Sequence, residues 1–150
     1  MSPGRTALRA VLVAVAVVAA DQVTKAIVRS SLAPGERHEI LPFLHLVRAR
    51  NEGIAFGALA GGGTIVIAIV AAALIGLVIY FVTNSTKRLA WLPTGLLLGG
   101  ALGNIIDRVR DGAVTDFLKL PHWPQFNVAD IAVTLGVLSL FFALDDRRDR

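Results

Sequence analysis

The sequence contains no cysteine, and only 17% of its 150 residues are charged. The lack of cysteine excludes a thiol nucleophile, a structural disulfide and metal ligation by thiolates. The charge content is low, because a typical soluble domain contains about 25% charged residues. Apolar residues fill the difference: 55% of the chain is hydrophobic, and these residues gather in runs that are long enough to cross a bilayer. This pattern is typical of an integral membrane protein.

Two hydrolytic chemistries also lack their usual motifs. His38-Glu39 begins the His-Glu-x-x-His pattern of zinc peptidases, but Pro42 stands where the second histidine is needed and would break the helix. The three histidines show no metal-ligand spacing, and the serines lie in no nucleophile motif. The carboxylates therefore remain as the candidate catalytic groups.

Four apolar runs predict four membrane-spanning helices within a single domain, at residues 8–28, 64–82, 90–106 and 128–144. The first run, with Arg5 and Arg9 before it and Ala19-Ala20 within it, also resembles a cleaved signal peptide. The three further runs favour a retained helix. Between the first two runs, residues 40–50 partly alternate and predict a strand or hairpin. Residues 54–59 form a small apolar patch that is expected to dip into lipid.

An even number of spans places both termini on one side of the membrane, and the polar residues in or beside the spans then fall together at the opposite face. The positive-inside count does not fix the orientation, because the outer segments carry as many basic residues as the inner ones. The net charge is +4. The basic residues flank apolar runs, which suits anionic lipid head groups better than nucleic acid.

Asp116 and Asp130 are the candidate catalytic pair, since two carboxylates in one site share a proton and can act as acid and base on one water. Each also has a structural interpretation: Asp130 as a helix cap and Asp116 as an ordinary loop carboxylate. Asn127 is the better placed residue for the cap. Asp21 and Lys25 lie at i and i+4 on one helix face and can pair, either in a functional site or at the water interface.

Five short motifs carry a resemblance to a known family. They are, in chain order, Asp21-Gln22-Val23-Thr24-Lys25, Asn51-Glu52-Gly53-Ile54-Ala55-Phe56-Gly57, the stretch GGALGNIIDR at residues 99–108, Val114-Thr115-Asp116-Phe117 and Phe126-Asn127-Val128-Ala129-Asp130. In this order and at these spacings they resemble the sequence boxes of bacterial lipoprotein signal peptidase, signal peptidase II. The match runs from Asp21 to the fourth predicted span.

The resemblance implies an aspartic endopeptidase of the bacterial inner membrane. Such an enzyme removes signal peptides from diacylglyceryl-modified prolipoproteins by cleaving before the lipidated cysteine. It implies Asp116 and Asp130 as the catalytic dyad. The residues that match substrate-binding or supporting positions are Asp21, Lys25, Asn51, Gly103, Asn104, Arg108, Asn127 and Ala129.

The fold implied by the resemblance is four transmembrane helices with a small extracytoplasmic β-sheet cradle and an amphipathic surface segment. Both termini would be cytoplasmic and the active site periplasmic. The resemblance further implies no metal, no cofactor and inhibition by cyclic peptides such as globomycin. We expect the chain to work as a monomer in contact with membrane lipids and to bind no nucleic acid. The basic outer segments are the one feature that the resemblance does not explain.

Two other functions stay open on the sequence. Acids within membrane helices also mark proton or cation paths, but such a path needs acids at several depths. The glycine-rich third run would suit a non-catalytic scaffold whose helices bind partners closely.

Overall fold

The computed structural model describes residues 2–53, 63–84 and 90–145, and within them the chain forms four helices and a three-stranded sheet. The helices are α1 (Pro3–Ser31), α2 (Gly63–Asn84), α3 (Trp91–Asp111) and α4 (Val128–Asp145). The strands are β1 (Arg37–Leu41), β2 (Leu44–Asn51) and β3 (Val114–Lys119). The predicted four-helix architecture with a small antiparallel sheet is therefore confirmed. The predicted amphipathic segment covers residues 51–59, and its part from residue 54 onward, which includes the predicted apolar patch, lies outside the described residues.

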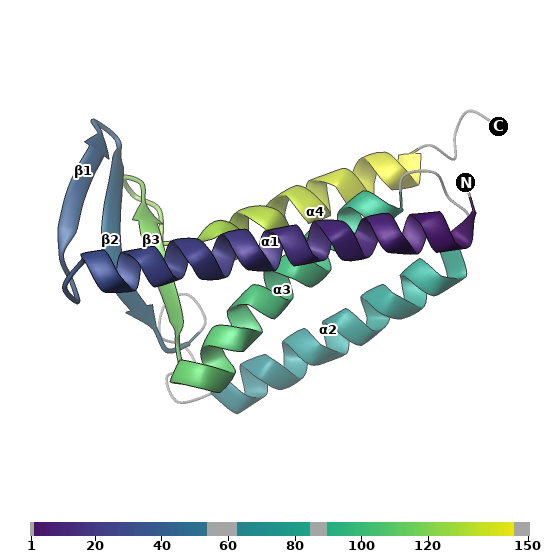
Figure 1. The fold of residues 1–150 in the computed structure, drawn as a ribbon, viewed down its shortest axis with the longest axis horizontal. Helices are drawn as coiled ribbons and strands as arrows, with labels where there is room; N and C mark the ends of the chain where they lie inside the picture. The colour runs from purple at the N-terminus through teal and green to yellow at the C-terminus, as the bar shows by residue number, and fades with distance from the viewer. Residues whose placement is uncertain (1, 54–62, 85–89, 146–150) are drawn as a thin grey trace.

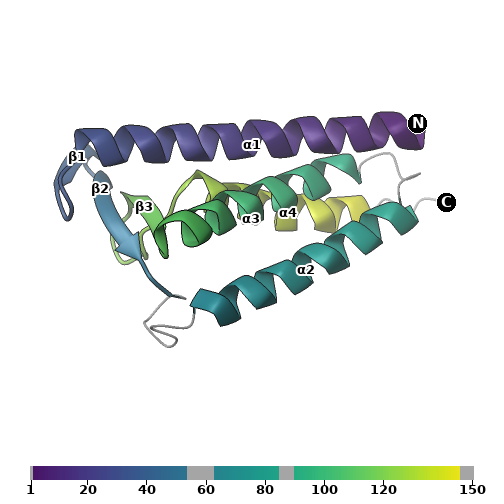
Figure 2. The same cartoon turned by 60° about the horizontal axis from the view of Figure 1, so that its bottom comes forward.

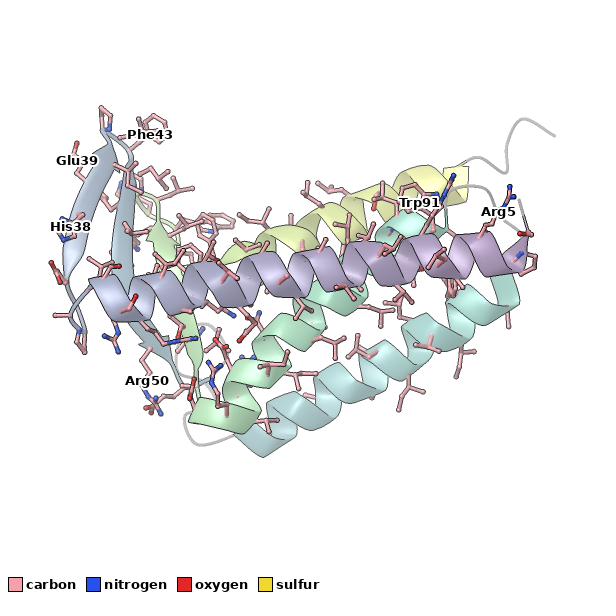
Figure 3. The ribbon with its side chains drawn as sticks, viewed as in Figure 1. Arg5, His38, Glu39, Phe43, Arg50 and Trp91 are labelled. Carbon is pink, nitrogen blue, oxygen red and sulfur yellow. The ribbon has the colours of Figure 1, made fainter. Side chains whose placement is uncertain are left out.

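The helices form an elongated bundle with the sheet at one end (Figure 1). The start of α1 and the end of α4 lie at the opposite end, and α2 leans away from the other helices (Figure 2). Of the described elements, α2 packs only against α3, whereas α3 packs closely on both α1 and α4. Figure 3 shows His38, Glu39, Phe43 and Arg50 at the sheet end, and Arg5 and Trp91 at the other.

Apolar side chains of the helices point out of the bundle as well as into it. Large apolar side chains are exposed along the bundle, for example Leu12, Val15, Ile75 and Leu138. Among the residues that the structure describes, α1 is the one helix that is long and apolar enough to cross a membrane by length and composition alone. Ala72–Phe81 and Val128–Leu140 are shorter apolar helical stretches. A water-soluble bundle would bury such side chains.

The sheet is antiparallel with the order β1-β2-β3, and β2 pairs Ala49 with Asp116 and Asn51 with Val114. The interpretation of Asp116 as a loop residue is wrong, because Asp116 lies in the middle of β3. The stretch Val114–Lys119 is only six residues long, and its pairing partner is far away in the sequence. A local pattern could not show that pairing.

The third helix is longer than the predicted span of residues 90–106, since α3 continues to Asp111. The last turns of α3 contain polar residues, and one of these, Asp107, is buried. Gly112 ends the helix in the left-handed conformation with φ of 72° and donates its N–H to Arg108 O. Arg50 Nη2 donates to the exposed carbonyl of Asp111 at 3.0 Å, which also fastens β2 to the end of α3.

The loop between β3 and α4 folds back tightly. Leu118 and Phe126 form an isolated antiparallel bridge, in which the N–H of each donates to the carbonyl of the other. His122 adopts a positive φ of 57° in the turn between Pro121 and Pro124. This bridge brings the chain back beside β3. Asn127, the residue just before α4, therefore lies directly beside β3.

The contact between α1 and α3 depends on glycines that allow the two backbones to approach closely. A Cβ on Gly99 would lie 2.7 Å from Val17 Cβ and 2.8 Å from Ala14 O. A Cβ on Gly95 would lie 2.7 Å from Ala10 O. Because backbone atoms cannot swing aside as a flexible side chain can, any larger residue here pushes the helices apart.

We therefore predict that Gly99→Val destabilises the protein by roughly 1–3 kcal/mol through overpacking. The thermal unfolding midpoint of the purified protein in detergent micelles should fall by several degrees. Gly76→Val in α2 is the matched control, because no atom lies within 4 Å of a Cβ added there. An unchanged midpoint for Gly99→Val, or an equal loss for the control, would contradict the close helix contact.

Candidate active site

The two predicted catalytic carboxylates are joined by a single residue, Asn127. Its Nδ2 donates to Asp116 Oδ1 at 2.8 Å, and its backbone N–H donates to Asp130 Oδ2 at 3.1 Å. Its Oδ1 in turn accepts the backbone N–H of Asp130 at 3.0 Å. This reciprocal pair is a capping box at the start of α4, and it confirms Asn127 as the helix cap. Asp130 is therefore held by the cap without being the cap itself.

The remaining oxygen of each carboxylate also accepts a hydrogen bond from an asparagine. Asn51 Nδ2 donates to Asp116 Oδ2 at 3.0 Å, and Asn104 Nδ2 donates to Asp130 Oδ1 at 2.9 Å. Asn51 comes from the end of β2 and Asn104 from α3, so the pair is positioned by four separate elements. Neutral amide donors orient both carboxylates without neutralising either of them.

Burial makes the carboxyl of Asp116 a weaker acid than an ordinary aspartate. Its pKa is raised from 3.8 to about 6. Desolvation is the main cause of the rise, and the nearby Asp130 contributes to it. The hydrogen bonds from Asn51 and Asn127 and the charge of Lys25 act in the opposite direction but are smaller than the desolvation. A carboxyl with this pKa can hold a proton near neutral pH, which an exposed aspartate does not.

Behind the pair lies an ammonium group that is fully removed from solvent. The Lys25 side chain is 0% exposed, and its Nζ lies 2.7 Å from Asp21 Oδ2 and 3.1 Å from Asp107 Oδ2. It also donates to Asn104 Oδ1 at 3.0 Å. The predicted i,i+4 pairing of Asp21 with Lys25 is thus confirmed, and its location is the buried network. The three acceptors use all three N–H groups of the ammonium.

Each acceptor of Lys25 holds the chain next to a candidate catalytic aspartate. Asp107 Oδ2 accepts the N–H of Thr115 at 3.0 Å, and Asp21 Oδ1 accepts the N–H of Ala129 at 2.9 Å. Asn104 bonds directly to Asp130. The network therefore fixes β3 beside Asp116 and α4 beside Asp130 through the same buried charge.

Two small residues make room for this network. A Cβ on Gly103 would lie 2.7 Å from Asp21 Oδ2 and 3.3 Å from Ala129 Cβ. Ala129 is completely buried. Larger side chains at either position would separate α3 from α1 or from α4. The supporting roles predicted for Gly103 and Ala129 thus have a steric basis here.

Gln22 is a member of the network to which the sequence analysis assigned no role. Its Nε2 donates to Asp107 Oδ1 at 2.9 Å and to Gly103 O at 3.1 Å. The available signal was its position one residue after Asp21 and three before Lys25, which places it beside the polar face of α1.

An apolar cavity opens next to Asp130. It has a volume of about 730 Å³ and lies between α2, α3 and α4. Most of its lining is aliphatic, and its polar residues include Asn104, Arg108 and Asp130. The guanidinium group of Arg108 has no hydrogen bond or ion pair with the part of the chain that the structure describes. A second hollow of about 250 Å³, lined by Trp123 and Phe126, meets Asp130 from another side.

The structure thus brings all ten predicted site residues to the sheet end of the bundle, with Arg108 at the cavity wall and the other nine in the contacts described above. Among residues 2–53, 63–84 and 90–145, no group of three or more potential metal ligands occurs. Two carboxyls in one site beside an apolar cavity, one of them with a raised pKa, can carry out acid–base hydrolysis. This is the chemistry of the aspartic class of peptidases.

Comparison with known proteins agrees with this class. The family model of signal peptidase II matches residues 13–144. A lipoprotein signal peptidase of Moorella thermoacetica is 42% identical over 135 residues, which cover 89% of this chain and 90% of the relative. A lipoprotein signal peptidase of Staphylococcus aureus is 40% identical over 140 residues, covering 89% and 86% of the two chains.

Two solved structures of bacterial membrane enzymes have the same fold. One superposes with a TM-score of 0.84 at 37% identity and covers 93% of this chain and 89% of the other. The second has a TM-score of 0.82 at 38% identity, with 94% of both chains covered. The chain belongs to the signal peptidase II family. It is accordingly a membrane protease, and the role of its family is the removal of signal peptides from prolipoproteins.

The pKa of Asp116 predicts a pH dependence of stability. Because its pKa is raised from 3.8 to about 6, the folded state binds this proton more tightly than the unfolded state does. The contribution to folding is therefore largest below about pH 4 and is lost as the pH rises to about 6, with a size on the order of 2–3 kcal/mol. Asp116→Asn removes this titration. The midpoint of thermal unfolding should then depend less on pH between 4 and 6.

Glu39→Gln is the control for that measurement, because Glu39 is an exposed carboxylate on β1. It should leave the pH dependence of wild type unchanged. If Asp116→Asn and wild type lose the same stability between pH 4 and 6, the raised pKa is wrong.

Proposed function

We propose that the chain cleaves diacylglyceryl-modified lipoprotein precursors immediately before the lipidated cysteine, with Asp116 and Asp130 as the catalytic pair. The observation that carries this proposal is the double hydrogen bonding of Asn127, which holds the two carboxylates in one site. Family membership supports the substrate class.

The environments of the two carboxylates support different roles in hydrolysis. Asp116 has the raised pKa of about 6 and holds the proton, whereas Asp130 acts as the base. Asp130 takes a proton from water as the water oxygen attacks the scissile carbonyl carbon, and Asp116 donates its proton to the carbonyl oxygen. Asp130 then gives its proton to the amide nitrogen, and Asp116 takes a proton from one hydroxyl of the tetrahedral intermediate as the C–N bond breaks. The pair returns to one proton shared between two carboxyls.

The cavity of about 730 Å³ beside Asp130 suits an apolar substrate segment. Its aliphatic wall would take apolar groups of the precursor, and its polar end would receive the peptide bond. Arg108 lines that end, and its guanidinium is available to bind a backbone carbonyl of the substrate. Asn104 would hold Asp130 during the reaction through the bond already present at 2.9 Å.

We further propose that all four helices cross the membrane, with both termini cytoplasmic and the sheet end on the extracytoplasmic side. The shortest helix, α4, has 18 residues and would span about 27 Å at 1.5 Å per residue, close to the hydrocarbon thickness of a bilayer. The exposed apolar side chains along the bundle support this placement. A monomeric state and inhibition by globomycin stay predictions from the family resemblance.

Replacement of either catalytic carboxylate should abolish turnover. We expect Asp116→Asn and Asp130→Asn each to lower kcat by at least about 10³-fold, since neither can exchange the proton that the mechanism requires. The assay is gel-shift cleavage of a lipid-modified precursor by the purified protein in micelles. Glu39→Gln, an exposed carboxylate-to-amide change on β1, should keep the wild-type rate. Near-normal turnover by either aspartate variant would refute the assignment.

The pH profile of the reaction tests the proton on Asp116. With its pKa at about 6, the proton-bearing form of the free enzyme becomes less populated above that pH. The value of kcat/KM should then fall about tenfold per pH unit on the alkaline side. A kcat/KM that stays constant or rises between pH 7 and 9 would show that Asp116 is not the proton donor.

A further inference from the structure

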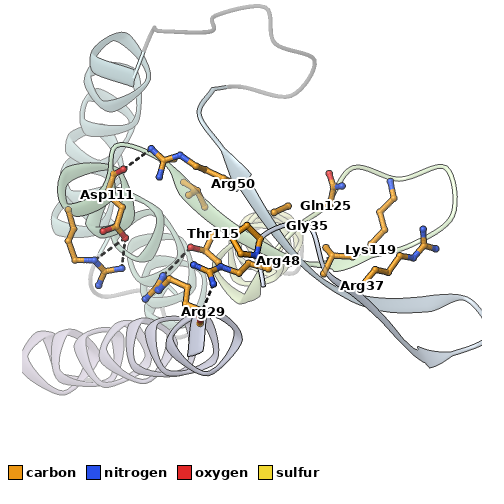
Figure 4. Close-up of a pocket in the computed structure, with 15 residues that line it drawn as sticks. Arg29, Gly35, Arg37, Arg48, Arg50, Asp111, Thr115, Lys119 and Gln125 are labelled. Atoms are coloured by element: carbon orange, nitrogen blue, oxygen red, sulfur yellow. Dashed lines mark hydrogen bonds and ion pairs between the residues drawn. The ribbon is translucent and has the colours of Figure 1, made fainter. Parts of the chain in front are cut away.

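A second, basic cavity lies on the side of β3 away from the carboxylate pair. It has a volume of about 820 Å³ and is bounded by the ends of α1 and α3 and by the sheet (Figure 4). Its cationic lining residues are Arg29, Arg37, Arg48, Arg50, Arg110 and Lys119. Asp111 is the one acidic lining residue. The residues that line the cavity therefore carry a large net positive charge.

The central guanidinium groups are held in place by uncharged acceptors. Arg48 Nη1 donates to the carbonyls of Arg29 at 2.9 Å and of Leu32 at 2.8 Å, which closes the last turn of α1. Arg29 Nη1 donates to Thr115 Oγ1 at 3.1 Å. Its nearest carboxylate, Asp107, is 4.0 Å away and already pairs with Lys25. Both half-buried cations are thus oriented without being neutralised.

The other cations of the cavity differ in their partners. Arg50 pairs with Glu52, and Arg110 pairs with Asp111. Among the described residues, the one acceptor of the Lys119 ammonium is a carbonyl, that of Trp123. In the described part of the chain the Arg37 side chain has no ion pair or hydrogen bond, and it lies on the same side of the cavity as Lys119 (Figure 4). An anion in the cavity would relieve the repulsion among these groups, and planar guanidinium pairs match the oxygens of phosphate.

An apolar stripe on α3 leads from the cavity towards the middle of the bundle. Leu102, Ile106 and Arg110 are four residues apart and therefore lie on one helix face. Leu102 is 41% exposed and Ile106 is 36% exposed. The stripe extends about 12 Å from Arg110 at 1.5 Å per residue. A basic cavity at the end of an exposed apolar stripe matches the two parts of a phospholipid. The cavity would bind the phosphate, and the acyl chains would lie along the stripe on α3.

We propose that this cavity is a binding site for the phosphate of an anionic phospholipid, with Arg29 and Arg48 as its central ligands. It is separate from the catalytic pair, because neither Asp116 nor Asp130 lines it. Thr115 lines the basic cavity, whereas Asp116 bonds to Asn51 and Asn127. A bound lipid would therefore contact the back of the strand that carries Asp116.

Lipid binding can be measured without any catalytic assay. Full-length protein in a neutral detergent is titrated with dioctanoyl phosphatidylglycerol, and the thermal unfolding midpoint is followed. We expect a saturable rise that weakens with added salt, since the attraction is electrostatic. Dioctanoyl phosphatidylcholine and inorganic phosphate, each at matched ionic strength, should give much smaller shifts.

The variants test the position of the site. Arg48→Gln should weaken the apparent affinity for phosphatidylglycerol about tenfold or more, as expected for the loss of a charged hydrogen bond. Because Arg48 also caps α1, Arg37→Gln provides a second variant. Arg37 is exposed on β1, and its side chain makes no hydrogen bond or ion pair within the described chain. The variant should weaken affinity in the same direction. Arg5→Gln, at the opposite end of the bundle (Figure 3), is the matched control and should bind as wild type.

Three results would overturn the proposal. An equal shift with phosphatidylcholine would show that charge plays no part. An equal shift with inorganic phosphate would show that the cavity takes the free anion and needs no lipid. Wild-type affinity in both Arg37→Gln and Arg48→Gln would place the lipid elsewhere on the protein.

Discussion

The buried ammonium of Lys25 is the interaction on which the rest of the site depends. An unpaired charge in this position would be very costly, because both water and counter-ions are excluded. Two carboxylates and one amide stabilise the ammonium, and they belong to Asp21, Asp107 and Asn104. Those three acceptors are also the groups that hold Thr115, Ala129 and Asp130. The geometry of the proposed catalytic pair is thus set by the hydrogen-bonding requirements of one buried lysine.

This arrangement separates positioning from chemistry. The charged groups Asp21, Lys25 and Asp107 are completely buried. They lie behind the site and fix the backbone beside each of the two carboxylates that we propose to be catalytic. The contacts made directly to Asp116 and Asp130 come from asparagines and a backbone N–H. Neutral donors can orient a carboxylate while leaving its proton free to move, whereas a lysine or arginine bonded directly to it would keep it ionised.

Local features of the site were predictable from the sequence, and long-range features were not. The pairing of Asp21 with Lys25 follows from their spacing on one helix face, and the capping role of Asn127 follows from its residue type at the start of an apolar run. The strand Val114–Lys119 was missed because its evidence is a pairing with β2, whose Ala49 lies opposite Asp116. The basic cavity was equally hidden: its cations were visible as scattered outer charges, but they come from different helices and strands and meet only in the folded chain.

The first helix has a consequence for how the protein is made. Asp21 and Lys25 pair within α1 itself, at 2.7 Å. In the proposed membrane placement, this segment can therefore leave the ribosome and enter the lipid phase with its two opposite charges already matched. The second carboxylate of the cluster, Asp107, belongs to α3 and is synthesised some eighty residues later. Its arrival supplies the last partner of the ammonium. Biogenesis can therefore proceed helix by helix without an intermediate in which a lone charge is stranded in the bilayer.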